Sequence, residues 1–144
     1  MNRLTSVTRL DGNIPVIVER GMDELNLKDV RLVLTGSQHA IRNSIRMALN
    51  DSGFAKENIR DGADAKVIAH AISEEFNPDI IICDYDVRDG DLVRLITDIR
   101  HGKVGSDPFV AIIAVSWKAT ESMVTGMLGA GVDFIVAAPV SPRQ

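Results

Sequence analysis

The sequence predicts a single α/β domain built on a doubly wound parallel sheet of five strands. Two apolar runs, residues 80–82 and 109–115, show no alternation of apolar and polar positions, which is typical of strands buried on both faces. Other segments have apolar residues at helical spacing. Strands that alternate with helices favour parallel pairing and right-handed crossovers over separate helical and strand regions.

Composition limits the classes of function. The chain has 144 residues and a net charge of −4, from 16 Lys and Arg against 20 Asp and Glu. No basic run is long enough to follow a nucleic-acid backbone, so we expect no direct nucleic-acid partner. The apolar runs are shorter than the ~20 residues of a membrane span, and the single cysteine, Cys83, lies inside an apolar run. We therefore expect a cytoplasmic protein with no membrane association.

Residues 1–29 are predicted to be an extension that precedes the domain. Residues 1–13 show no periodicity, and residues 14–18 form an aliphatic segment whose early proline suits an edge strand. We expect residues 1–29 to be a partly mobile extension and residues 30–144 to form the domain. The first strand of the sheet is predicted at residues 30–34.

A helix and a weak strand come next. Ile41, Ile45 and Leu49 are spaced by four, which predicts a helix, and Gly53 is placed to end it in a left-handed conformation. Residues 57–60 are a weak candidate for the second strand. A further helix is indicated by apolar residues at helical spacing, which are Val67, Ile68, Ala71, Ile72 and Phe76.

The most informative segment is the strand at residues 80–84, which ends on the carboxylate of Asp84. An acidic loop follows, and Asp91 is placed to cap the next helix. In open α/β sheets, ligands and chemistry gather at the carboxyl ends of the strands, so Asp84 lies where a functional group is expected.

The remaining elements repeat the pattern. The strand at residues 109–115 ends at Ser116 and Trp117. A helix with apolar residues at 123, 124, 127 and 128 ends around Gly129 and Gly131, and a fifth strand is predicted at residues 134–137.

Taken in order, these pieces resemble the receiver domain of response regulators, the phosphoacceptor module of bacterial two-component signalling. The similarity covers about residues 30–142 and is carried by residues 78–84, 130–134 and 138–141. It implies a flavodoxin-like fold with strand order 2-1-3-4-5. It also implies phosphorylation of Asp84, contact of Ser116 with the phosphoryl group, and a sensor histidine kinase or phosphotransfer protein as the partner.

The pocket departs from the family at three charged positions. The acidic pair at the end of the first strand falls on Thr35 and Gly36, and the lysine near the fifth strand falls on Ala138. Mg²⁺ requires oxygen ligands that usually include carboxylates, so we expect it to bind weakly, with Asp84 and Asp86 as candidate ligands and Asp89 as a further acid that could replace a missing one. Trp117 stands where the family usually has a small residue and is expected to close part of the pocket.

Two other interpretations stay open. The missing acids favour a pseudo-receiver that binds another signalling protein without phosphorylation. Alternatively, residues 35–37 lead into a helix whose exposed N–H groups could bind a phosphate, a nucleotide or a flavin, although the glycine pattern of a dinucleotide site is absent. In each case we expect a binding or signalling module and no enzyme.

The end of the sequence gives one more expectation. Ser141 and Pro142 have the form of a helix start, yet only two residues follow. We therefore expect the last helix of the fold to be missing or truncated, leaving apolar sheet surface exposed. Residues 14–18 or a second copy of the chain would then cover this surface, and the second option predicts a homodimer.

Overall fold

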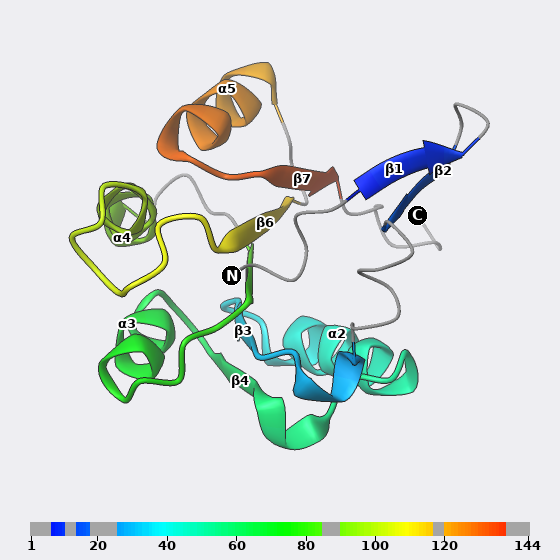
Figure 1. The fold of residues 1–144 in the computed structure, drawn as a ribbon. Coiled ribbons are helices and arrows are strands. Elements are labelled where there is room, and N and C mark those ends of the chain that lie inside the picture. Colours follow the sequence, from blue (N-terminus) through cyan, green and yellow to red (C-terminus); the bar gives the residue numbers. More distant parts are fainter. Residues whose placement is uncertain (1–6, 11–13, 18–25, 85–89, 117–119, 138–144) are drawn as a thin grey trace.

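The computed structural model describes residues 7–10, 14–17, 26–84, 90–116 and 120–137 (Figure 1). The strands are β1 (Val7–Leu10), β2 (Ile14–Ile17), β3 (Leu32–Thr35), β4 (Ile59–Gly62), β5 (Ile80–Asp84), β6 (Ala111–Ser116) and β7 (Phe134–Ala137). The α-helices are α2 (His39–Asp51), α3 (Lys66–Ser73), α4 (Gly90–Arg100) and α5 (Glu121–Ala130), and two 3₁₀ turns are Leu27–Asp29 and Lys56–Asn58.

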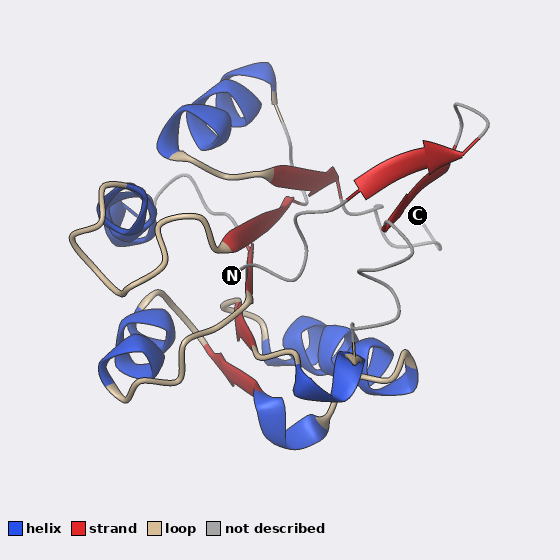
Figure 2. Cartoon of the chain, viewed as in Figure 1, coloured by secondary structure: helices blue, strands red, loops and turns tan. Residues whose placement is uncertain are grey.

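Five of the strands form one parallel sheet in the order β4-β3-β5-β6-β7. Counted along this sheet alone, the order is 2-1-3-4-5, so the predicted fold class is confirmed. The helices cover the sheet unequally. Helices α3, α4 and α5 lie along one face, while α2 lies on the other (Figure 2).

Strand β5 is the centre of this sheet. Ile81 is paired with Val33 of β3 on one side and with Ile112 of β6 on the other. Ile81 and Cys83 are buried against α3, α4 and α5, and Ile82 is buried in the cluster that includes α2. The prediction of a strand buried on both faces is therefore confirmed for β5.

The same prediction is wrong for one face of β6. The residues that face α4 and α5 are buried, whereas Ile113 and Val115 on the opposite face are only half-buried. In β7, Phe134 is 62% exposed and Val136 is 49% exposed, and they are paired with these two residues. The physical reason is that α2, the helix described on this face, packs over β3 and its cluster rather than over β6 and β7.

Three local predictions also differ from the structure. Val7–Leu10, expected to lie in an irregular tail, forms a strand that pairs antiparallel with β2, and β2 confirms the predicted aliphatic strand. Asp91 does not cap α4, because the helix begins one residue earlier, at Gly90. Strand β6 begins at Ala111, because Asp107 accepts a hydrogen bond from the amide of the exposed Phe109 and turns the chain there.

The predicted ends of the helices can be compared with the structure only in part. Gly53 and Gly131 have φ of +110° and +116°, so both helix ends predicted from glycine are confirmed. The expected loss of the last helix concerns residues 138–144, which lie outside the described residues. Among the helices that are described, none has the length and apolar character to cross a membrane.

Arg100, the last residue of α4, joins three segments at the amino-terminal edge of the sheet. Its guanidinium donates to three backbone carbonyl oxygens, those of Pro108 (2.7 Å), Val110 (2.8 Å) and Gly131 (2.8 Å). It also donates to Asp133 at 2.7 Å, and the same carboxylate oxygen accepts from the amide of Ile112 at 2.9 Å. Arg100 thus fixes the entry to β6 and the connection between α5 and β7.

We expect Arg100→Met to lower the free energy of unfolding by about 3 kcal/mol, because three carbonyl oxygens lose the guanidinium as a donor and Asp133 loses its ion pair. Arg94→Met on the same helix is the matched control. Arg94 pairs with Asp91 at 3.9 Å where both side chains are exposed, so its loss should change stability by less than about 0.5 kcal/mol. Urea unfolding measures both, and equal effects would contradict the role given to Arg100.

Candidate functional site

The site predicted from the sequence lies at the carboxyl-terminal edge of the sheet. Thr35 and Gly36 end β3 and begin its following loop, Asp84 ends β5, and Ser116 ends β6. These strands are neighbours and run parallel, so the structure brings the four residues to one edge. Asp86, Trp117 and Ala138, the other predicted pocket residues, lie outside the described part of the chain.

Gly36 is closely packed between two side chains. A Cβ atom added at this position would lie 3.3 Å from Asp84 Cβ and 3.3 Å from Arg42 Cγ. The amide of Gly36 donates to the carbonyl of Gly62 at 3.1 Å, which ties the loop to β4. A side chain at position 36 would therefore require Arg42 or Asp84 to move by a few tenths of an ångström.

Three charged residues at this edge were not singled out from the sequence. Arg42 of α2 donates through Nη1 to the carbonyl of Gly36 at 2.6 Å and through Nε to Asp61 Oδ2 of β4 at 3.2 Å. Arg46, one turn later, pairs with the other oxygen of Asp61. The side chains of Arg42 and Asp61 are only 14% and 20% exposed. The signal available was the spacing of four, which places both arginines on one helix face.

These residues do not fit a divalent metal ion. Thr35 and Gly36 carry no carboxylate, and the described residues contain no group of three or more His, Cys, Asp or Glu that could hold a metal. Hard cations such as Mg²⁺ need oxygen ligands in octahedral geometry, usually with carboxylates among them. The described edge of the sheet instead places the stem of Arg42 beside Asp84, with its guanidinium bonded to Asp61 and to the carbonyl of Gly36.

Ser116 stands out for a different reason. It is 1% exposed, and its Oγ has no hydrogen-bond partner among the described residues. Buried hydroxyls are nearly always hydrogen-bonded, because an unpaired one costs free energy. The hydroxyl at the end of β6 is therefore free to donate a hydrogen bond to a ligand or a covalently attached group that is bound only part of the time.

The loop of residues 35–37 retains its possible role with anions. It leads into α2, whose N-cap residue, Gln38, makes no side-chain capping hydrogen bond. Anions are stabilised at such a helix start by the N–H groups and the helix dipole. Arg42 adds a positive charge to the same loop, which further favours an anion over a cation there.

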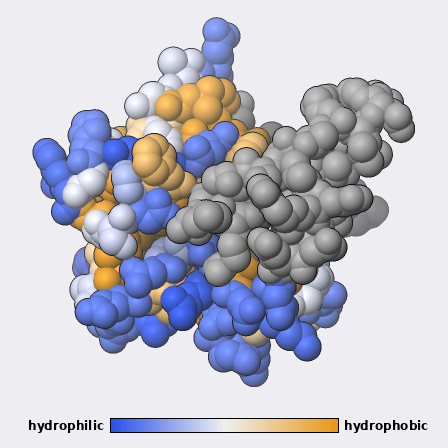
Figure 3. All heavy atoms as spheres, in the orientation of Figure 1, coloured by the Kyte–Doolittle hydropathy of each residue, from blue (hydrophilic) through white to orange (hydrophobic). Residues whose placement is uncertain are grey.

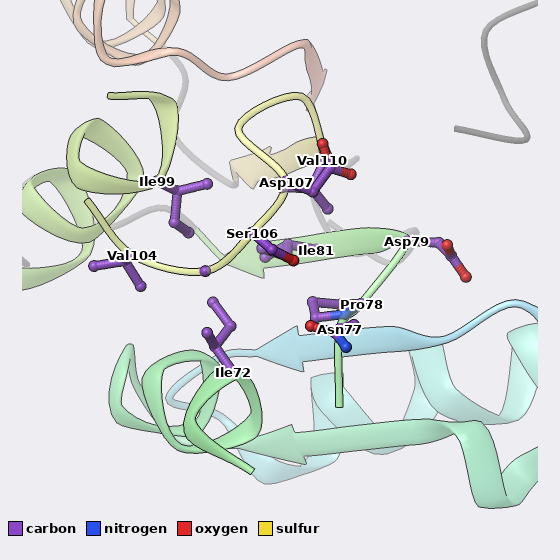
Figure 4. A pocket seen from close by; sticks show the side chains of 11 residues that line it. Ile72, Asn77, Pro78, Asp79, Ile81, Ile99, Val104, Ser106, Asp107 and Val110 are labelled. Carbon is purple, nitrogen blue, oxygen red and sulfur yellow. The ribbon is translucent and has the colours of Figure 1, made fainter. Parts of the chain in front are cut away.

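A cavity of about 140 Å³ lies at the other edge of the sheet, between the ends of α3 and α4 and the loop before β6 (Figure 4). Its lining is mainly aliphatic, with Ile72, Ile81, Ile99, Val104 and Val110. The carboxylates of Asp79 and Asp107 there accept backbone N–H groups, those of Arg31 and Phe109, each at 2.9 Å. Small-molecule sites usually measure roughly 300–1,000 Å³, so this cavity is too small for a nucleotide or a flavin.

The fold is shared with solved proteins. A protein from Burkholderia pseudomallei described as related to pilus assembly matches with a TM-score of 0.63 and 15% identity, over 83% of this chain and 84% of its own. The chemotaxis protein CheY4 of Vibrio cholerae matches with a TM-score of 0.62 and 16% identity, over 79% of this chain and 90% of its own. No protein-family model and no curated protein matches the sequence. The fold is therefore receiver-like.

We expect Ser116→Ala to leave the free energy of unfolding unchanged or to raise it by up to about 1 kcal/mol, because it removes a buried hydroxyl without a partner. Thr120→Ala is the comparison. Thr120 caps α5 by accepting from the amide of Met123 at 3.2 Å, and its loss should cost about 1 kcal/mol. Denaturant unfolding at equal protein concentration measures both variants, and a larger loss for Ser116→Ala would show that its hydroxyl is bonded.

Proposed function

We propose that this chain is an atypical receiver module of a two-component or phosphorelay pathway, with Asp84 as the candidate phosphoacceptor. The observation that carries the proposal is the position of Asp84. It ends the central strand of a receiver-like sheet, beside the neighbouring strand that ends on Ser116, whose hydroxyl has no partner in the described part of the chain. On this proposal a sensor histidine kinase or a phosphotransfer protein supplies the phosphoryl group, and the chain acts on no free metabolite.

Phosphorylation of Asp84 would add negative charge at this edge of the sheet, and a signal follows only if donors or cations receive that charge. The hydroxyl of Ser116 is one donor within reach of the same edge. With Thr35 and Gly36 in place of two acids, Mg²⁺ contributes weakly. We therefore propose that the chemistry is slow and that the module signals chiefly through the partners it binds.

A second candidate, a pseudo-receiver that binds a protein without phosphorylation, is favoured by the apolar surface. Phe134 and Val136 expose large apolar side chains on the same face of the sheet as α2, over β7, which α2 does not cover. Apolar residues also gather over α5 at the top of the space-filling view, where Leu128 is exposed (Figure 3). Exposed apolar surface is a feature of interaction sites, and a second copy of the chain is one candidate partner for Phe134 and Val136.

The phosphoacceptor is tested by incubating the protein with phosphoramidate and measuring its intact mass. We expect slow addition of one phosphoryl group, which Asp84→Asn abolishes because the amide cannot form the acyl phosphate. Asp79→Asn, one residue before the same strand begins, should label like the wild type. Labelling that survives in Asp84→Asn would contradict the assignment of this residue.

The apolar face is tested by sedimentation over a concentration series. We expect self-association that is weakened by changing Phe134 and Val136 to Asp, because burial of these side chains would stabilise the complex. Phe109→Asp is the control, since this phenylalanine is 77% exposed but precedes β6 at the other edge of the sheet. A monomer at every concentration would exclude the homodimer and leave a different protein as the partner of this face.

A further inference from the structure

The charges at the carboxyl-terminal edge point to a cation that the protein supplies itself. We propose that Arg42 takes the place of a divalent metal ion at Asp84, by exchanging its ion pair with Asp61 for one with the phosphoryl group. This inference rests on the proposed function. It adds which residue neutralises the phosphoryl group, and it adds that Asp61 binds this residue before phosphorylation.

The first support is the position of the Arg42 side chain. Its stem lies beside Asp84, since a Cβ atom added at Gly36 would be 3.3 Å from Arg42 Cγ and 3.3 Å from Asp84 Cβ. Its guanidinium is turned toward β4, where it bonds to Asp61 and to the carbonyl of Gly36. Arginine side chains carry several rotatable bonds, so the guanidinium can turn from β4 toward β5 without movement of α2. Gly36 has no side chain that would obstruct this path.

The second support is the double pairing of Asp61. Its two oxygens are bound separately, Oδ2 by Arg42 and Oδ1 by Arg46. Removing the partner of a partly buried charge is costly when no other partner remains. Here Arg46 keeps Asp61 paired after Arg42 departs. The cost of releasing Arg42 is therefore small compared with the release of an arginine from a carboxylate that it alone neutralises.

The third support is the unused capacity of the guanidinium. Nε, Nη1 and Nη2 of Arg42 contact Asp61, Gly36 and His39 respectively. Each terminal nitrogen carries a second N–H group, and neither of these has an acceptor among the described residues. A planar pair of donors matches a phosphoryl group, which arginine binds through two parallel hydrogen bonds.

The chemical step itself needs no further reactant. A carboxylate oxygen of Asp84 attacks the phosphorus of phosphoramidate, a P–O bond forms and the P–N bond breaks. The nitrogen leaves as ammonia after it takes a proton from water, and nothing is oxidised or reduced. The product carries more negative charge than Asp84, so it competes more strongly than Asp61 for the guanidinium of Arg42.

The experiment measures the rate of phosphoramidate labelling in EDTA and in Mg²⁺. We expect equal rates for the wild type under both conditions, and a loss of about a hundredfold in Arg42→Met, as when one charge-stabilising donor is removed from an active site. Arg42→Lys should be intermediate, because it keeps the charge and loses the paired donors. Arg94→Met, at an exposed arginine of α4, is the control and should label like the wild type. Arg46→Met should lower the rate, because Asp61 then has no second arginine to pair with when Arg42 leaves.

Asp61→Asn separates a functional Arg42 from a structural one. Weakening the competing carboxylate should release the guanidinium of Arg42 and raise the labelling rate. If the ion pair of Arg42 with Asp61 only holds α2 against β4, the rate does not increase. Thermal unfolding of every variant shows that the sheet remains folded. A wild type that labels only with Mg²⁺, or an Asp61→Asn variant that labels more slowly, would overturn the proposal.

Binding of inorganic phosphate keeps the test independent of the proposed function. If Asp84 accepts no phosphoryl group, the phosphoacceptor role fails, but Arg42 should still draw phosphate to Gly36. We expect NMR shifts of the Gly36 amide and the Arg42 Nε–H on phosphate addition. The shift of the Gly36 amide should be lost in Arg42→Met and retained in Arg94→Met. If the wild type shows neither labelling nor these shifts, Arg42 only joins α2 to β4, and the inference is wrong.

Discussion

The need to keep a charge out of the apolar interior determines where this protein can have a functional site. Strand β5 passes through the middle of the sheet, with Ile81 and Cys83 buried on one face and Ile82 on the other. An unpaired carboxylate within such a strand would cost several kcal/mol, so Asp84 can stand only where the strand emerges. The neighbouring strands run parallel, and their carboxyl ends bring Gly36 and Ser116 to the same edge.

Much of this fold could be predicted because local physics determines it. An isoleucine run without alternation indicates a strand covered on both faces, and Gly53 and Gly131 mark helix ends through their positive φ. The wrong prediction that β6 is buried on both faces arose because burial is not a local property. An apolar run shows that its residues favour burial, but whether a helix covers them depends on segments far away in the sequence. Ile113 is half-buried for that reason.

The site residues at the ends of strands could be predicted from the sequence, whereas the ion pairs that join a helix to a strand could not. Asp84, Thr35, Gly36 and Ser116 follow from strand boundaries, which the sequence pattern gives. The ion pairs of Arg42 and Arg46 with Asp61 depend on how α2 lies over β3 and β4 and on how far each side chain reaches. Helical spacing places the arginines on one face, but it does not identify which carboxylate they meet.

The close packing around Gly36 constrains how this pocket could change during evolution. An acidic side chain at position 36, as the resemblance to receiver domains would place there, meets Arg42 and Asp84 at the same point in space. The effect of that substitution therefore depends on what stands at position 42, and the two changes are not additive. An acid at position 36 is therefore accommodated only if Arg42 or Asp84 moves by a few tenths of an ångström. The residue at position 42 thus decides how well the pocket tolerates the side chain that a metal site would need.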